Sequence, residues 1–201
     1  MSEVSWIDPS LLGFYSLASS PAPLPHLREA AHTAILRQAN ALAEAATVRR
    51  FRVALGDHDY SWGSAERVLH RAALFLMADS LQPSPRLRQS ALDQLAWILG
   101  NNAADHSFVT TFGTNPVLRP WHWKYRDYGV VLPGWAVGGP DSFPEGVDPA
   151  LKALQQQGTA PARCYVDLCS RNGSWASNEG QISEEAALVF VTGVLRVSAG
   201  R

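Results

Sequence analysis

The stretch Tyr60–Ala78 reads YSWGSAERVLHRAALFLMA and joins a glycine-containing turn to an apolar, helix-like run. Apolar residues recur in it with the period of one helix face: Ala65, Val68, Leu69, Ala72 and Leu76. This spacing is typical of an amphipathic α-helix with one buried face. We therefore predict a helix over about Ser64 to Leu81.

The same period appears on both sides of this segment. It predicts a short helix near Pro9 to Ser19, a longer one over about Leu27 to Val48, and one over about Pro85 to Leu99. Ser84 before a proline is a suitable N-cap for the last of these, and Gly100 is a suitable end.

The final element is predicted over about Glu179 to Ser198. Glu184 and Glu185 near its start and Arg196 near its end suit the dipole of a helix. Its middle, AALVFV (Ala186 to Val191), is apolar on every side, which predicts a fully buried helix or strand. Length and the glutamate-rich start favour the helix.

The stretch between Asn101 and Asn178 is rich in Gly, Pro, Trp and Asn and shows no helical period. Such a long irregular segment in a compact domain is commonly functional. We expect an all-α fold of four to five helices, antiparallel to their neighbours, with this stretch as a long loop face.

Composition excludes several classes of protein. The chain has 201 residues, 46% hydrophobic and 17% charged, with a formal net charge of −1. It can bury a core, and it lacks the basic excess of a nucleic-acid binder. No stretch reaches the roughly 18 apolar residues of a membrane helix. The segment Met1 to Phe14 lacks the pattern of a secretory leader.

Cysteine usage argues against a structural zinc site, and no metal or cofactor is expected. Cys164 and Cys169 are separated by four residues, without a histidine at ligand spacing beside them. Two free thiols and a disulfide both remain open.

Further motifs follow in order: LDQLAWILGNNAADHSFVTTFGTNP (Leu92 to Pro116), PGWAVGGPD (Pro133 to Asp141), PARCYVD (Pro161 to Asp167) and NEGQISEEAALVF (Asn178 to Phe190). With the Tyr-x-Trp-Gly-Ser turn, they resemble the C-terminal half of the catalytic domain of glycoside hydrolase family 9, the cellulase type. The resemblance covers about Trp6 to Val197 and preserves the order of five motifs.

The resemblance implies an inverting hydrolase of β-1,4-linked glucan and an (α/α)6 barrel of twelve helices. Residues 1–201 would form the C-terminal portion of that domain and supply about half of the helices. An oligo- or polysaccharide is the implied substrate, and no nucleic acid or membrane partner is expected. An open half-barrel would expose an apolar seam, which favours self-association or pairing with a missing N-terminal half. Family members are commonly secreted.

Two carboxyl groups carry the implied chemistry. The family's general acid is the glutamate of an Asn-Glu pair, here Glu179. A partly buried position would raise its pKa and keep it protonated. The alternative is an ordinary glutamate of a first helical turn. Asp167, in Tyr-x-Asp, matches a position in the family's active-site cleft, or else makes a turn hydrogen bond.

The sugar-binding loop departs from the family pattern. Where the family has Pro-His-His-Arg, this chain has RPWHWKYR (Arg119 to Arg126). Trp121 and Trp123 replace the first histidine and the arginine, and only His122 is kept. Arg126 and Lys124 are candidates to replace the lost cation. Trp175 is a further candidate, as a platform for a sugar or as packing beneath Glu179.

The family's catalytic base is absent from the sequence. The family carries it on an Asp-Ala-Gly-Asp turn in the N-terminal half, and this chain has no such motif. Asp57 and Asp59 are weaker candidates because their loop differs from the family's. Glu185 also replaces a family asparagine. The alternatives to an enzyme are a non-catalytic carbohydrate-binding protein and a helical interaction module whose partner covers the open half-barrel.

Overall fold

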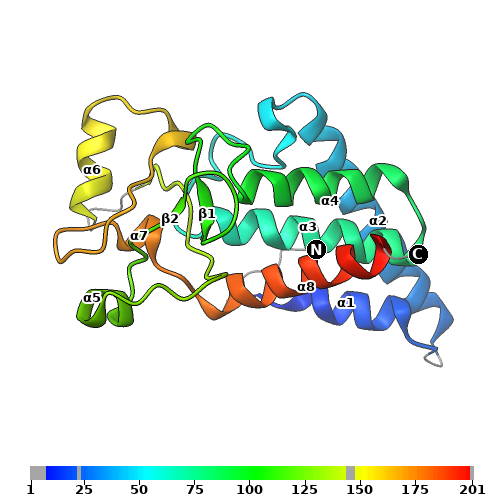
Figure 1. The fold of residues 1–201 in the computed structure, drawn as a ribbon. Helices are drawn as coiled ribbons and strands as arrows, with labels where there is room; N and C mark the ends of the chain where they lie inside the picture. Colours follow the sequence, from blue (N-terminus) through cyan, green and yellow to red (C-terminus); the bar gives the residue numbers. More distant parts are fainter. Residues whose placement is uncertain (1–7, 22–23, 144–147, 200–201) are drawn as a thin grey trace. The chain divides into compact units, whose positions relative to one another are not determined.

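The computed structural model describes residues 8–21, 24–143 and 148–199. Residues 1–7 lie outside this description. They belong to the segment Met1 to Phe14, in which the sequence shows no secretory leader pattern. The long helices are α1 (Ser10–Ser19), α2 (Pro25–Thr47), α3 (Ser64–Leu81), α4 (Pro85–Ile98) and α8 (Ile182–Ala199) (Figure 1). The shorter elements are η1 (Arg50–Arg52), β1 (Ser107–Thr110), β2 (Pro116–Val117), α5 (Trp123–Tyr128), α6 (Pro149–Gln156), η2 (Pro161–Arg163) and α7 (Trp175–Asn178).

The chain forms two compact units. Unit 1 comprises residues 1–54, 67–95 and 189–201, and unit 2 comprises residues 55–66 and 96–188. The boundaries therefore fall inside α3, α4 and α8. Within the described ranges, no helix combines the length and the apolar character needed to cross a bilayer.

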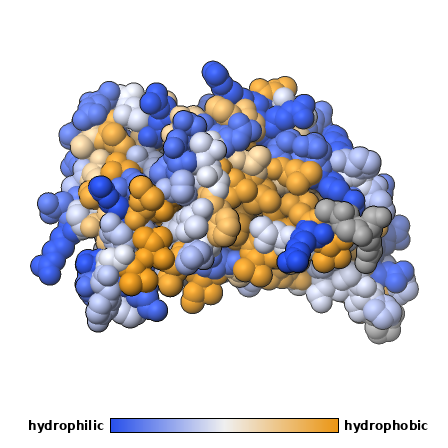
Figure 2. All heavy atoms as spheres, in the orientation of Figure 1, coloured by the Kyte–Doolittle hydropathy of each residue, from blue (hydrophilic) through white to orange (hydrophobic). Residues whose placement is uncertain are grey.

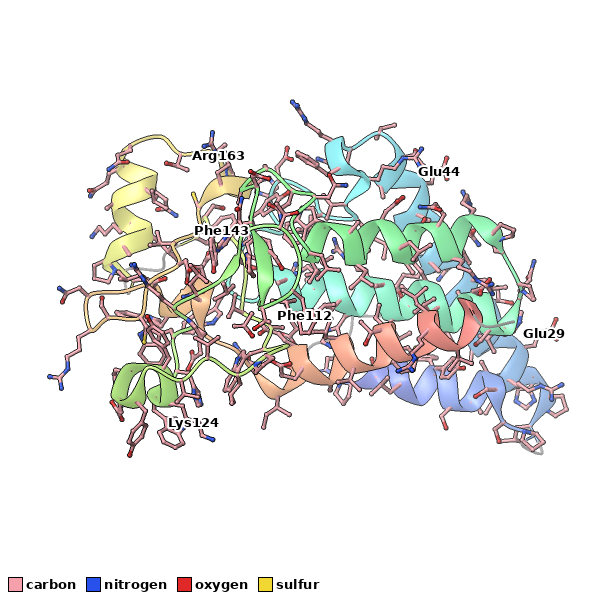
Figure 3. All side chains as sticks on the ribbon, in the orientation of Figure 1. Glu29, Glu44, Phe112, Lys124, Phe143 and Arg163 are labelled. Atoms are coloured by element: carbon pink, nitrogen blue, oxygen red, sulfur yellow. The ribbon has the colours of Figure 1, made fainter. Side chains whose placement is uncertain are left out.

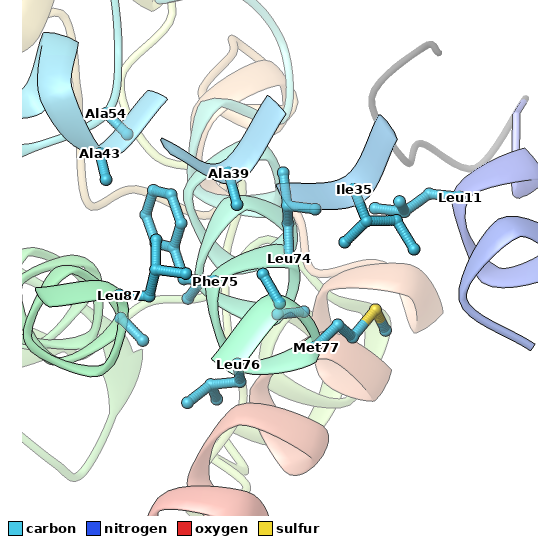
Figure 4. Packing of buried hydrophobic residues seen from close by; sticks show 14 of the residues in the cluster. Leu11, Ile35, Ala39, Ala43, Ala54, Leu74, Phe75, Leu76, Met77 and Leu87 are labelled. Atoms are coloured by element: carbon cyan, nitrogen blue, oxygen red, sulfur yellow. The ribbon is translucent and has the colours of Figure 1, made fainter. Parts of the chain in front are cut away.

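The core of unit 1 is built largely from alanines and a few larger side chains. α1 packs against α2, and α2 buries four alanines and Ile35 at helical spacing: Ala31, Ala39, Ala43 and Ala46. Small side chains let neighbouring helices approach closely. Figure 4 shows Ala39 and Ala43 of α2 directed toward the side chains of α3.

α3 is the central helix of this core. Every residue from Ala72 to Ala78 is buried, and Phe75 is completely inaccessible. Leu74, Phe75 and Met77 leave the helix in different directions (Figure 4), as expected for a helix that is covered on all sides. The predicted bounds of α3, Ser64 to Leu81, are confirmed.

The predicted start of α4 is also confirmed. The hydroxyl of Ser84 accepts a hydrogen bond from the N–H of Leu87 at 3.4 Å, which is the contact of an N-cap. The N–H of Ser84 donates to Asp79 at 2.7 Å, and Arg88 forms an ion pair with the same carboxylate at 2.7 Å. The turn between α3 and α4 is therefore held by one carboxylate at the end of α3.

Unit 2 contains more regular structure than the sequence predicted. The segment expected to be a bare loop holds, among its described residues, the parallel pair β1–β2, the short helices α5, α6 and α7, and the 3-10 helix η2. Asp148 caps α6 by accepting from the N–H groups of Ala150 and Leu151, and His122 caps α5 by accepting from the N–H of Lys124. Helices of six and eight residues are too short to show a period, so only their caps could have indicated them.

The last helix is confirmed, but its predicted burial on every side is wrong. Ala187 and Val191 are buried, whereas Val189 is 70% exposed and Phe190 is 37% exposed. Figure 2 shows hydrophobic spheres grouped over the helices of unit 1, α8 among them. The apolar run therefore covers the core with one face and leaves an apolar face in contact with solvent.

Candidate functional site

Three backbone hydrogen bonds fix the segment Ser177–Glu179 in unit 2. The N–H groups of Gly139, Trp121 and Gly138 donate to the carbonyls of Ser177, Asn178 and Glu179, at 2.8, 2.8 and 3.0 Å respectively. The glycine-rich loop and the tryptophan-rich loop, far apart in sequence, thus hold the same three residues.

Glycine is required where the first of these loops makes its contacts. A Cβ on Gly138 would lie 3.3 Å from the carbonyl oxygen of Ala176. Gly139 has a φ of +77°, and a Cβ there would lie 3.0 Å from that of Ala65. The N–H of Ala65 in turn donates to the carbonyl of Gly138 at 2.9 Å. The start of α3 therefore belongs to the same cluster of motifs.

Glu179 lies between α7 and α8 in an extended conformation, with φ −83° and ψ 136°. α8 begins only at Ile182, so the alternative of an ordinary first-turn glutamate is wrong. The side chain is partly buried, and this burial raises its pKa above the usual value. A carboxyl group in this state retains its proton to a higher pH than a solvated one.

Asp167 is joined to the residue that precedes Glu179. Its carboxylate accepts hydrogen bonds from the N–H groups of Leu118 and Arg119, at 2.8 and 2.9 Å, and from the side-chain amide of Asn178 at 3.4 Å. The hydroxyl of Tyr165 donates to the Asn178 amide oxygen at 2.5 Å. Asp167 therefore ties the loop at Leu118–Arg119 to the segment that carries Glu179.

His122 lies against aromatic rings in the tryptophan-rich loop. Its ring centroid is 4.2 Å from that of Trp135 and 5.5 Å from that of Trp123. Its Nδ1 accepts from the N–H of Lys124 at 3.2 Å. Burial, and then the nearby Lys124 charge, lower the pKa of His122. The neutral imidazole is therefore favoured, and Nδ1 is already engaged within the loop.

The three candidate tryptophans differ in their accessibility. Trp121 and Trp175 are half-buried and pack edge to face with centroids 6.2 Å apart. The Trp121 ring nitrogen also donates to the carbonyl of Ser170 at 3.1 Å. Trp123 is 50% exposed, and the Lys124 ammonium lies 5.6 Å from its ring centroid. Figure 3 shows Lys124 on α5. Trp123 thus presents the most open indole of the three.

The remaining candidates lie on exposed parts of unit 2. Arg126 forms a two-point pair with Asp127, with its Nε 2.8 Å from one carboxylate oxygen. Asp59 accepts from the N–H of Gly56 at 2.7 Å within its own turn, and Asp57 is exposed in the same turn.

The sequence interpretation gave Glu184, at the acidic start of α8, no role beyond compensation of the helix dipole. Glu184 is fully buried, and Glu185 accepts a hydrogen bond from the N–H of Ala136 at 2.7 Å. Burial first, and then the neighbouring Glu66, Glu185 and Glu179, raise the pKa of Glu184 well above its usual value. A glutamate at a helix start gives no local sign of such burial.

The described residues also include potential metal ligands and the two cysteines. Across residues 8–21, 24–143 and 148–199, no group of three His, Cys, Asp or Glu side chains is arranged to hold a metal ion. Cys164 and Cys169 are both free thiols, which settles the open question in favour of the unpaired state.

Comparisons with known proteins agree on one family. The model of glycosyl hydrolase family 9 matches residues 7–192. Endoglucanase C of Cellulomonas fimi is 29% identical over 193 residues, which are 92% of this chain and 17% of that protein. The crystal structure of the GH family 9 endoglucanase J30 covers 100% of this chain with a TM-score of 0.90 at 30% identity, and 36% of its own chain is matched.

A third similar structure is that of AaCel9A in complex with a cellobiose-like isofagomine. It covers 97% of this chain with a TM-score of 0.83 at 28% identity, and 36% of its own chain is matched. The chain thus spans little more than a third of these solved structures. They have the (α/α)6 barrel fold, so the predicted all-α class and the assignment to part of such a barrel are confirmed.

Proposed function

Since the chain belongs to glycosyl hydrolase family 9, we propose that it is the acid-bearing portion of an inverting hydrolase of β-1,4-linked glucan. Glu179 is the proposed general acid. The observation that supports this role best is the combination of a backbone fixed by three hydrogen bonds with a carboxyl group whose pKa is raised by burial. Relatives with cellulase names support the class of substrate.

The proposed reaction needs two carboxyl groups on opposite sides of the glycosidic bond. Glu179 gives its proton to the glycosidic oxygen as the bond to the anomeric carbon breaks. A second carboxylate takes a proton from the water that attacks the other face of that carbon. In inverting enzymes these groups are about 6.5–9.5 Å apart, which leaves room for the water.

We place the base outside these 201 residues. The sequence has no Asp-Ala-Gly-Asp turn, and the solved relatives are much longer than this chain. A missing general base typically costs about 10²- to 10⁴-fold in rate. The chain by itself should therefore hydrolyse β-glucans very weakly or not at all. Asp57 and Asp59 are the second choice for the base.

The other candidate residues are assigned supporting roles in this proposal. Asp167 orients the segment around Glu179 through Asn178. Trp123, with its open ring, would stack on a sugar. His122 and Arg126, in the tryptophan-rich loop Arg119–Arg126, would contact hydroxyl groups of the sugar. Trp121, packed against Trp175, would hold this loop in place.

The acid assignment is tested with leaving groups of different acidity. The leaving group of a dinitrophenyl cellobioside is acidic enough to depart without a proton. The sugar leaving group in carboxymethylcellulose must be protonated as the bond breaks. In the chain joined to a base-bearing partner segment, Glu179→Gln should abolish hydrolysis of the polymer and spare the activated cellobioside. Equal loss on both substrates, or no loss on the polymer, would exclude Glu179 as the general acid.

Assays of the isolated chain test whether the catalytic base lies within these 201 residues or outside them. Wild type and Glu179→Gln are assayed on the same two substrates, and glucan binding is measured by calorimetry. We expect binding with little or no turnover. Robust turnover of the polymer that disappears in Glu179→Gln would place a base within these residues, and Asp57 and Asp59 would be replaced next. Binding without turnover in every form, with a partner segment included, would favour a non-catalytic carbohydrate-binding protein.

A further inference from the structure

Glu184 holds the first turn of α8 through one of its two carboxyl oxygens. The helix begins at Ile182, so Gln181 is its N-cap and Glu184 its third residue. Glu184 Oε2 accepts a hydrogen bond from the Gln181 N–H at 3.2 Å. This is the backward contact of a capping box, in which the third residue satisfies the N-cap N–H.

The second oxygen of Glu184 is in an unusual position for a carboxylate. The residue is 0% exposed, and within the described residues no donor forms a hydrogen bond with Oε1. A buried oxygen of an ionised carboxylate loses its hydration without replacement, which is strongly unfavourable. A protonated Oε1 avoids this loss because it carries a hydrogen and acts as a donor itself.

The charged groups that act on Glu184 are all acidic. They are Glu66 on α3, Glu185 on α8 itself and Glu179 on the segment before α8. Glu66 is itself only 6% exposed. No cationic side chain is among the groups that shift its pKa, and the Gln181 N–H is the one group among them that favours the charged form. Burial and the three carboxyl groups all act in the same direction.

We propose that Glu184 is a neutral carboxylic acid at neutral pH and a positioning residue for Glu179, with its hydroxyl donating to the Glu66 carboxyl and its carbonyl oxygen accepting from Gln181. The positioning part rests on the proposed function of Glu179. Glu179 and Glu184 bracket a short segment, so fixing the first turn of α8 fixes that segment from one side. A neutral group does this without placing a permanent negative charge near the general acid.

The pH dependence of stability follows from the direction of the shift. The folded state keeps the Glu184 proton to a pH at which the unfolded chain has released it. The stabilisation is therefore complete below the unfolded pKa, about 4.3, and is lost as the pH rises toward the folded pKa. Within that window the folding equilibrium constant falls by up to about tenfold per pH unit because of this one proton.

The test compares urea unfolding of wild type and Glu184→Gln over a range of pH from 4 to 8. Glutamine resembles the neutral acid because it carries an acceptor carbonyl and a donor group, the NH2, and has no charge. We expect similar midpoints at the acid end and a higher midpoint for Glu184→Gln at the alkaline end. Glu44→Gln, on the exposed face of α2 (Figure 3), is the matched control and should run parallel to wild type. A Glu184→Gln curve parallel to wild type at all pH values would overturn the proposal.

A second measurement does not depend on the variant's folding. In wild type with ¹³C-labelled glutamate carboxyls, one signal should remain that of a protonated acid at pH 7. Loss of that signal in Glu184→Gln would assign it, and a wild type without such a signal would overturn the proposal.

The same spectra report on Glu179. Its signal is identified by its absence in Glu179→Gln, and its titration should be unchanged by Glu184→Gln, because a neutral neighbour adds no charge. A lowered Glu179 pKa in that variant would mean that Glu184 is ionised. None of these measurements uses a sugar, so their failure leaves the proposed function standing. Failure of the leaving-group test would remove the general acid and leave the Glu184 proton in place.

Discussion

Gly180, the residue after the proposed general acid, occupies a position where no side chain fits. A Cβ built there would overlap the ring nitrogen of Trp135 and lie 2.5 Å from the carbonyl oxygen of Ala136. Both neighbours belong to the loop that holds Glu179 in place. The glycine is thus required by close packing and not by its backbone angles.

Gly180→Ala should destabilise the protein by about 1–3 kcal/mol, because the added methyl group forces Trp135 or the backbone to move. Urea unfolding measures this. Gly193→Ala, in α8, is the matched control, since nothing lies within 4 Å of its Cβ. It should stabilise the protein by roughly 0.5–1 kcal/mol, as alanine does in a helix. A Gly180→Ala midpoint equal to that of wild type would contradict the packing argument.

Individual residues also show where sequence interpretation stops. Glu179 could be proposed because a motif of several residues surrounds it. Glu184 could not be distinguished from an exposed glutamate, because its burial and its proximity to Glu66, far away in the sequence, appear only in the folded chain. The exposure of Trp123, as opposed to Trp121, depends likewise on whether Trp175 packs against the ring.

At the scale of elements, Asp148 joins two short helices that neither sequence period nor core packing would specify. Its buried carboxylate accepts from the N–H groups of Ala150 at 3.1 Å and Leu151 at 3.4 Å in α6. It also accepts from Ser174 at 2.7 Å and Ala176 at 3.0 Å, at the start of α7. One side chain thus satisfies the free N–H groups of two helix starts.

Asp148→Ala should lower the free energy of unfolding by about 3 kcal/mol or more, because buried N–H groups lose a charged acceptor. Denaturant unfolding gives the free energy, and hydrogen exchange at Ala150 and Ala176 locates the effect. Asp127→Ala removes an exposed carboxylate and is the control. Unchanged protection of those two amides in Asp148→Ala would show that other contacts hold the helices.

The helices α2, α3 and α4 were predictable because each repeats its apolar pattern over at least three turns. α5 and α6 were not, since their formation depends on single caps and on docking of the surrounding loop. The burial of α8 was predicted wrongly from Ala186–Val191. The sequence of an apolar run shows that it is hydrophobic, but it does not show how many neighbouring helices or loops cover it in the fold.

At the scale of the whole molecule, the chain corresponds to about a third of the length of the solved GH family 9 endoglucanase J30. It also has an apolar face that is exposed to solvent. Val189 is 70% exposed and Val197 is 60% exposed, both on α8. Exposed apolar patches on soluble proteins commonly mark sites of association. We expect this face to bind a second copy of the chain or the missing part of a barrel.

The double change Val189→Gln, Val197→Gln should weaken self-association while leaving the fold intact, because both side chains are already in water in the monomer. Sedimentation velocity over a concentration series measures the association, and circular dichroism checks the fold. Val48→Gln, at the end of α2 and 86% exposed, is the control. A wild-type chain that is monomeric at every concentration without a partner would contradict the expectation and count against a helical interaction module.

The way in which Ser177–Glu179 is held has a consequence for evolvability. The three hydrogen bonds that the glycine-rich and tryptophan-rich loops make to this segment run between main-chain atoms, so none of the three depends on the side chain at position 179. A histidine, cysteine or glutamine at position 179 would keep these three main-chain hydrogen bonds, and its side chain would start from the same backbone position as that of the glutamate. A single codon change could therefore exchange the reactive group without rebuilding the surrounding loops, which makes this surface open to a change of chemistry.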